Sequence, residues 1–155
     1  MPGQWECPGG AADPEDATIL DAAMRELWEE AGLRGRRVVG FVEEAGVQGQ
    51  GQVGDRLEGR GLTFSFVNRM GVFRRFYRVA FEVEVEVEGE GQRPVVRLDP
   101  EEHQDYLWVS EEEVRSRRVA GREIVLTAEM NTERMVLEAM RVRRERVGWG
   151  VDGGE

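Results

Sequence analysis

The chain is poor in cysteine, in long apolar runs and in basic residues relative to acidic ones. Its single cysteine, Cys7, excludes an internal disulfide and fits a reducing compartment, where the expected role is that of a small buried residue. No apolar run approaches the length that crosses a bilayer, and the first residues lack the basic and apolar pattern of a secretion signal. We therefore expect a soluble, cytoplasmic protein with no membrane partner.

The charge balance is acidic, with 31 Asp and Glu against 21 basic residues and a net charge of −10. This excess argues against general affinity for nucleic acid. It leaves room for a small phosphorylated substrate, because divalent metal ions would neutralise a site locally and arginines would still hold phosphate. The 155 residues, 40% hydrophobic and 34% charged, predict a single globular domain.

The most informative segment is Arg25–Leu33, RELWEEAGL, with Pro8–Gly10 upstream. Glu26, Glu29 and Glu30 fall on one predicted helix, and at about 100° per residue all three face nearly the same side. Like charges at these spacings destabilise an isolated helix by roughly a few tenths of a kcal/mol per pair. Clustered carboxylate oxygens suit Mg²⁺ or Mn²⁺. Standing alone, the three glutamates would be more typical of a solvated acidic face.

Together with Gly10, this segment resembles the Nudix box, whose usual form is G-x5-E-x7-R-E-U-x-E-E-x-G-U with U aliphatic. Every named position of the C-terminal half is filled. The left half is one residue longer than usual, because the first box glutamate falls at Asp16 counted forward from Gly10 and at Ala17 counted backward from Arg25. Either Glu15 or Asp16 must stand in for it.

The resemblance implies an α+β protein with the Nudix fold, an α/β/α sandwich around a mixed β-sheet, with the box as a loop–helix–loop at 9–33. It implies metal-dependent hydrolysis of a pyrophosphate link in a nucleoside diphosphate derivative, by attack of water on phosphorus. Arg25 would orient the glutamates, and Gly9 and Gly10 would shape the turn. The ligands of Mg²⁺ or Mn²⁺ would be Glu26, Glu29 and Glu30.

A second segment, 102–110 (EHQDYLWVS), looks like the family's later motif, in which an acidic residue before a Trp-Val strand reaches toward the metals. Glu102 is the match, and Glu101 is the near alternative. The base that deprotonates the water would be Glu26 or Glu102. His103, the single histidine, is more typical of a structural residue.

The domain is expected to span 1–147, followed by a disordered tail at 148–155. A Gly- and Gln-rich segment at 46–61 predicts a flexible loop. Glutamates at every second position of 82–88 indicate a solvated sheet face rather than a metal site, because residues two apart on a strand are separated by about 7 Å. The expected strands are 37–43, 62–67, 76–88, 95–98 and 106–109. The expected helices are one at 16–31, closed by Gly32 in the left-handed region, and a short one to about 117 that starts at a capping box of Ser110 with Glu113. A C-terminal helix, capped by Thr127, is expected at about 127–144.

Family members usually place strands ahead of the box, whereas only about eight residues precede Pro8–Gly10 here. We therefore expect an N-terminally shortened sheet, whose unpaired backbone and uncovered apolar surface favour low stability or self-association, including a homodimer. The alternative function is a catalytically weak or inactive Nudix-fold module for binding or regulation. The intact Arg25–Glu30 set favours the enzyme. The box does not determine which nucleoside diphosphate derivative is the substrate.

Overall fold

The structure is a computed structural model that describes residues 3–42, 62–67, 71–89, 91–128 and 131–149. Short helices and short antiparallel sheets alternate along the chain, and this mixture confirms the predicted α+β class. The predicted loop at 46–61 lies outside the described residues. The elements are α1 (Ile19–Ala31), β1 (Gly35–Val42), β2 (Leu62–Val67), β3 (Phe73–Arg78), β4 (Ala80–Val85), α2 (Glu111–Ser116), β5 (Arg118–Val119), β6 (Arg122–Glu123) and α3 (Thr132–Trp149).

The strands of the described residues pair in three antiparallel ladders, β1 with β4, β2 with β3 and β5 with β6. In the first ladder Phe41 lies opposite Phe81, with 5.0 Å between the ring centroids. A parallel bridge joins Trp5 to Leu126 outside these ladders, so among the described residues the sheets are antiparallel and the expected single mixed sheet is not formed. The N-terminal segment is therefore tied to the chain just ahead of α3.

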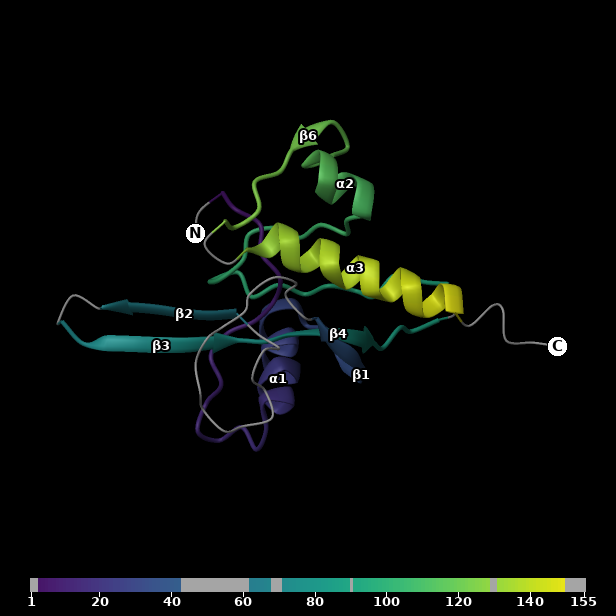
Figure 1. Ribbon diagram of the computed structural model, residues 1–155. Coiled ribbons are helices and arrows are strands. Elements are labelled where there is room, and N and C mark those ends of the chain that lie inside the picture. Colours follow the sequence, from purple (N-terminus) through teal and green to yellow (C-terminus); the bar gives the residue numbers. More distant parts are fainter. Residues whose placement is uncertain (1–2, 43–61, 68–70, 90, 129–130, 150–155) are drawn as a thin grey trace.

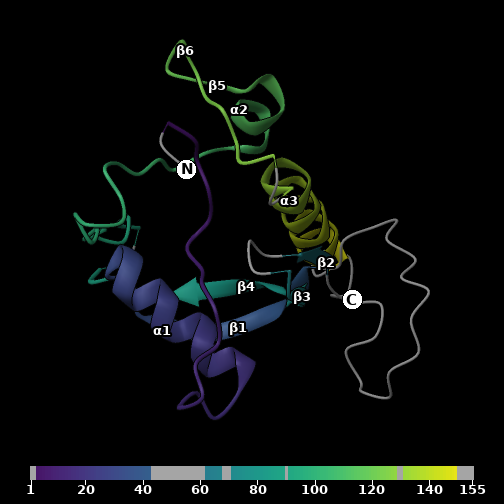
Figure 2. The same ribbon diagram turned by 90° about the vertical axis from the view of Figure 1, so that its left-hand side faces the viewer.

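The helices cover the β1–β4 ladder from two sides. Figure 1 shows α1 and α3 on opposite sides of this ladder, and both helices contact β1. The β2–β3 ribbon extends sideways from this layered part (Figure 1). In Figure 2, α2 and the β5–β6 ladder lie beside one end of α3, which α2 contacts. No helix among the described residues is long and apolar enough to cross a membrane.

Local sequence signals set both ends of α1. The helix begins after Thr18, whose side chain accepts a hydrogen bond from the Asp21 amide, so it starts later than the expected residue 16. Asp16 lies instead in the preceding turn, where its amide bonds the carbonyl of Asp13 at 3.1 Å. The predicted end is confirmed, because Gly32 caps the helix with a left-handed φ of 63°.

The helices α2 and α3 differ in how well their starts were predicted. The capping box of Ser110 and Glu113 is confirmed at the start of α2. α3 begins at Thr132, so the predicted cap at Thr127 is wrong. The Thr127 amide and hydroxyl both donate to the Trp5 carbonyl at 3.0 Å, which holds this residue beside the N-terminal segment. α3 continues through Trp149, beyond the expected end near 144 and into the predicted tail, whose remainder lies outside the described residues.

Two strand predictions need correction. The long strand expected at 76–88 is divided at Val79, because the residues before it pair with β2 and those after it pair with β1. The segments 95–98 and 106–109 form no strand in the described part of the chain. The Arg97 amide is instead bonded to the carbonyl of Ala31 at 2.8 Å, so this segment is anchored to the end of α1 rather than to a neighbouring strand.

Candidate metal site at the end of α1

Arg25 organises the acidic residues on the exposed side of α1. Its Nη1 donates to Glu26 Oε1 at 2.9 Å and to Glu29 Oε2 at 2.8 Å. Its other two nitrogens bond Asp16, Nε to Oδ1 at 3.2 Å and Nη2 to Oδ2 at 3.0 Å. Nη2 also donates to the carbonyl of Ala11 at 3.0 Å, which fixes the loop ahead of the helix. These contacts raise the pKa of Arg25 further above its ordinary value, chiefly through Asp16 and then Glu29.

The glycine loop approaches the glutamates closely. The Gly9 amide donates to Glu30 Oε2 at 2.9 Å, across 21 residues of sequence. Gly10 lies against Glu26, and a Cβ placed on it would stand 2.4 Å from Glu26 Oε1. A side chain at Gly10 would therefore displace the carboxylate, so the present position of Glu26 against the loop requires glycine here.

The segment that carries Glu102 is anchored to the last turn of α1. The Asp99 amide donates to the carbonyl of Glu30 at 3.2 Å. Asp99 in turn accepts at its own carbonyl from the amides of Glu102 at 3.2 Å and His103 at 2.9 Å. Gly32 makes this approach feasible, because a Cβ there would stand 2.8 Å from the Cβ of Arg97. A short chain of backbone bonds thus brings the second motif to the box.

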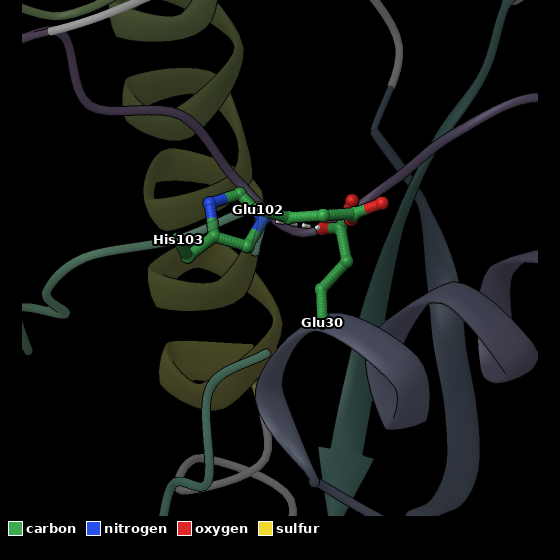
Figure 3. A group of neighbouring side chains, drawn as sticks. All are labelled: Glu30, Glu102 and His103. Carbon is green, nitrogen blue, oxygen red and sulfur yellow. Dashed lines mark ion pairs between the residues drawn. The ribbon is translucent and has the colours of Figure 1, made fainter. Parts of the chain in front are cut away.

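Three side chains converge above the end of α1. One ligand atom from each of Glu30, Glu102 and His103 lies within 4.8 Å of the others. Figure 3 shows the Glu30 and Glu102 side chains meeting at their carboxylates, with the His103 ring beside them. His103 Nε2 is 3.3 Å from Glu30 Oε2, an ion-pair distance if the imidazole is protonated. Among the described residues this buried nitrogen has no hydrogen-bond partner.

The electrostatics single out Glu30 among the glutamates. Its side chain is 11% exposed, and burial raises its pKa above the ordinary value, with a smaller increase from the charge of nearby Glu26. The Gly9 amide and the facing His103 act in the opposite direction. A buried carboxylate beside other acids is stabilised most directly by a cation.

The residues present fit a divalent cation. Glu30 and Glu102 supply hard oxygen donors, and Glu26 is close enough to influence the pKa of Glu30. His103 supplies a buried nitrogen without a hydrogen bond in the described part of the chain. The same nitrogen faces Glu30 Oε2 at 3.3 Å. The cluster therefore combines two carboxylates with a buried ring nitrogen, all of which are donor types that bind divalent metals.

The structure brings together only some of the residues that the sequence singled out. Glu30 and Glu102 meet directly, and the near alternative Glu101 bonds Asp99 Oδ1 through its amide. Glu26 is held between Arg25 and Gly10. The Glu29 side chain is 54% exposed and bonds Arg25, outside the three-residue cluster.

His103 is the residue that the sequence reasoning missed, because a lone histidine is usually structural. The available signal was its position next to Glu102 in the second motif. Of the two acids left open for the first box glutamate, Asp16 contacts Arg25, whereas Glu15 is exposed.

A family model described as the NUDIX domain matches residues 1–129, a range that contains the glycine loop, α1 and the segment of Glu102 and His103. No curated protein and no solved structure matches the chain.

Proposed function

The chain belongs to the Nudix family, and we propose that it hydrolyses a pyrophosphate link in a nucleoside diphosphate derivative with the help of Mg²⁺ or Mn²⁺. The family assignment supports pyrophosphate hydrolysis in general. The observation that carries the proposal is the convergence of Glu30, Glu102 and His103 beside the Arg25 network. A protein that only binds a partner has no evident use for charges arranged in this way.

We assign metal binding to the acidic side of α1 and its neighbour. Glu30 and Glu26 would be the principal ligands from the box, and Glu102 would face the same ion from the following segment without being a principal ligand. Glu29 is more exposed and pairs with Arg25, so it would face the solvent side from which a substrate approaches. When bound, the ion would neutralise phosphate charge and increase the acidity of a water molecule.

The protein's own groups then position the reactants and accept a proton. Water attacks phosphorus, the phosphorus–oxygen bond of the pyrophosphate link breaks, and a carboxylate takes the proton of the water. We assign this base to Glu102, because its carboxylate is exposed and forms no ion pair among the described residues. Glu26 is the alternative, although one of its oxygens is already engaged by Arg25 at 2.9 Å.

Arg25 would be a positioning residue. Its guanidinium fixes Glu26 and Glu29 relative to the loop carbonyl of Ala11 and to Asp16. Because a guanidinium offers five N–H donors in a rigid plane, it can hold several acceptors that one ammonium group could not. Gly9 would place its amide on Glu30 and keep the carboxylate oriented.

The experiment that tests the proposal is phosphate release from a panel of nucleoside diphosphate derivatives, with Mg²⁺, with Mn²⁺ and with a chelator. A coupled phosphatase makes each cleavage visible, and far-UV circular dichroism establishes that the protein is folded. We expect turnover that needs metal and that the chelator abolishes. Folded protein that is silent across the panel would contradict the proposal and favour the binding or regulatory module.

The choice of base is tested by two isosteric variants. Glu102→Gln is expected to reduce kcat while metal affinity changes less. Glu26→Gln is expected to weaken metal binding as well, since Glu26 is assigned as a ligand. The reverse pattern would move the base to Glu26.

A further inference from the structure

A second charged cleft lies away from the box, between α2 and α3, which Figure 2 shows side by side. Its volume is about 390 Å³, within the range of small-molecule sites. None of its lining residues belongs to the glycine loop, to α1 or to the segment of Glu102 and His103. They are Arg115, Arg117, Asn131, Glu133, Arg134, Leu137, Glu138 and Arg141.

The cleft gathers positive charge in an acidic protein. Four arginines against two glutamates line it, whereas the whole chain carries a net charge of −10. The chain contains no lysine, so all 21 basic residues are arginines. Arginine presents a planar fork of N–H donors that matches phosphate oxygens two at a time.

Two of these arginines keep one side of the guanidinium available. Arg115 directs Nε and Nη2 to Glu111, at 3.1 and 2.7 Å. Arg117 directs Nε and Nη2 to Glu133, at 2.9 and 2.7 Å. In the described part of the chain neither Nη1 atom has a bond, so each retains two N–H donors. Each of these two guanidinium groups therefore has one side paired with a glutamate and one side without a partner among the described residues.

Arg134 has fewer partners than Arg115 and Arg117. It forms no ion pair within the described residues; the pKa of Glu138 is lowered chiefly by the hydrogen bond from Arg141, with a smaller contribution from the charge of Arg134. The existing pairs of Arg115 and Arg117 are exposed, with arginine side chains 57% and 62% exposed. Exposed pairs of this kind contribute little stability. An anion with two or more charges can therefore gain these donors without breaking a strong interaction.

The backbone holds two lining residues in an unfavourable conformation. Arg117 has a φ of 52° at the C-terminal cap of α2, where glycine is usual, and Asn131 has a φ of 50° just ahead of α3. A left-handed φ is costly for Arg117, whereas asparagine adopts it more readily, so the backbone strain lies at Arg117. Arg144, which pairs with Glu111, also ties α3 to α2. This ion pair links the two helices that form the cleft.

We propose that this cleft between α2 and α3 binds a small molecule that carries phosphate groups, at a site separate from the metal cluster. Arg115 and Arg117 would bind it through their Nη1 donors, and Arg134 would supply a full fork. The inference is independent of the proposed hydrolysis, because no box residue takes part.

The test is calorimetric titration of the full chain with inorganic pyrophosphate in the presence of a chelator, which removes metal-assisted binding at the box. We expect saturable binding that weakens as salt is added. Arg134→Gln and Arg117→Gln should each weaken it by about tenfold, because each removes charge-assisted hydrogen bonds. Arg36→Gln, an exposed arginine on β1, removes the same charge elsewhere and should leave binding unchanged.

Further titrations distinguish binding in this cleft from binding at the box. Binding should survive Glu29→Gln with Glu30→Gln; its loss in that double variant would place pyrophosphate at the box and overturn the site. Citrate should bind more weakly; equal affinity would overturn the assignment to phosphate. No saturable binding at millimolar pyrophosphate, or equal affinity of Arg134→Gln and Arg36→Gln, would also overturn it. Circular dichroism checks folding, and Arg134→Gln decides the matter if Arg117→Gln loosens α2.

Discussion

The carboxylate of Asp16 accepts two hydrogen bonds from the guanidinium of Arg25, at 3.2 Å from Nε and 3.0 Å from Nη2. The same guanidinium bonds Glu26 and Glu29, so Asp16 anchors the residue that orients two glutamates of the helix. Glu15, its neighbour, is exposed. We therefore propose that Asp16 takes the place of the first box glutamate, and that the extra residue of the left half is absorbed in the turn before α1.

The first prediction concerns the pH dependence of the Asp16 contact. The hydrogen bond from Arg25, followed by the amide of Asp13, lowers the pKa of Asp16 below its ordinary 3.8. A lowered pKa means that this carboxylate stabilises the fold above the unfolded value and loses that contribution as the pH falls through the folded value. Asp16→Asn should lower Tm at pH 7, and the difference from the parent should shrink below pH 3.8.

This effect is measured by thermal unfolding, followed by circular dichroism at pH values from about 2 to 7. Glu15→Gln is the matched control, since it removes an adjacent acid that is exposed. A Glu15→Gln variant that loses as much stability as Asp16→Asn would contradict the assignment. Asp16→Asn should also reduce hydrolysis more than Glu15→Gln does.

The second prediction concerns Gly10. Gly10→Ala would place a Cβ 2.4 Å from Glu26 Oε1. The carboxylate is the far end of a flexible side chain, so it can move, and the fold should survive. Moving it would weaken the Arg25 contact and displace a proposed ligand, and small displacements of catalytic groups can cost about 10²-fold in rate. We expect hydrolysis to fall by about that factor with Tm nearly unchanged.

Gly40→Ala on β1 is the control for Gly10→Ala, because nothing lies within 4 Å of the added Cβ. It should keep both activity and Tm. If Gly10→Ala also keeps full activity, the position of Glu26 beside the loop has no part in the reaction.

The third prediction concerns Gly32, where two effects add. Its φ of 63° disfavours any residue with a Cβ by roughly 1–2 kcal/mol. A Cβ there would also stand 2.8 Å from the Cβ of Arg97 and 2.9 Å from its carbonyl oxygen, neither of which is flexible. Gly32→Ala should therefore destabilise the protein by more than the backbone strain alone.

Chemical denaturation of Gly32→Ala and Gly121→Ala separates those two effects. Gly121 has a φ of 80° and nothing within 4 Å of an added Cβ, so its replacement reports strain without collision. Equal losses of stability in the two variants would show that the contact between Gly32 and the Arg97 segment carries no energy.

Features set by neighbours in sequence were predictable. The left-handed cap at Gly32 and the capping box of Ser110 with Glu113 depend only on residues a few positions apart, and both are confirmed. The resemblance of the box to a family motif likewise needed only local spacing. The acidic side of α1 followed from helical periodicity and from no distant contact.

Features set by distant partners were not predictable in the same way. Thr127 had the chemistry of a helix cap, yet it bonds Trp5, 122 residues away in sequence. The division of the expected strand at Val79 depends on which earlier strand each half pairs with. His103 joins Glu30 only because backbone bonds anchor the following segment to the end of α1. These contacts are tertiary, and propensity carries no information about them.

The most direct test of the metal assignment is a titration with Mn²⁺ followed by electron paramagnetic resonance, on the parent and on the double variant Glu29→Gln with Glu30→Gln. This change keeps side-chain shape and removes two charges from the box. The control is Glu86→Gln with Glu88→Gln, which removes two exposed glutamates just after β4. We predict that the box variant binds Mn²⁺ more weakly by about 100-fold or more, while the control matches the parent. Equal affinity in all three proteins would contradict the account.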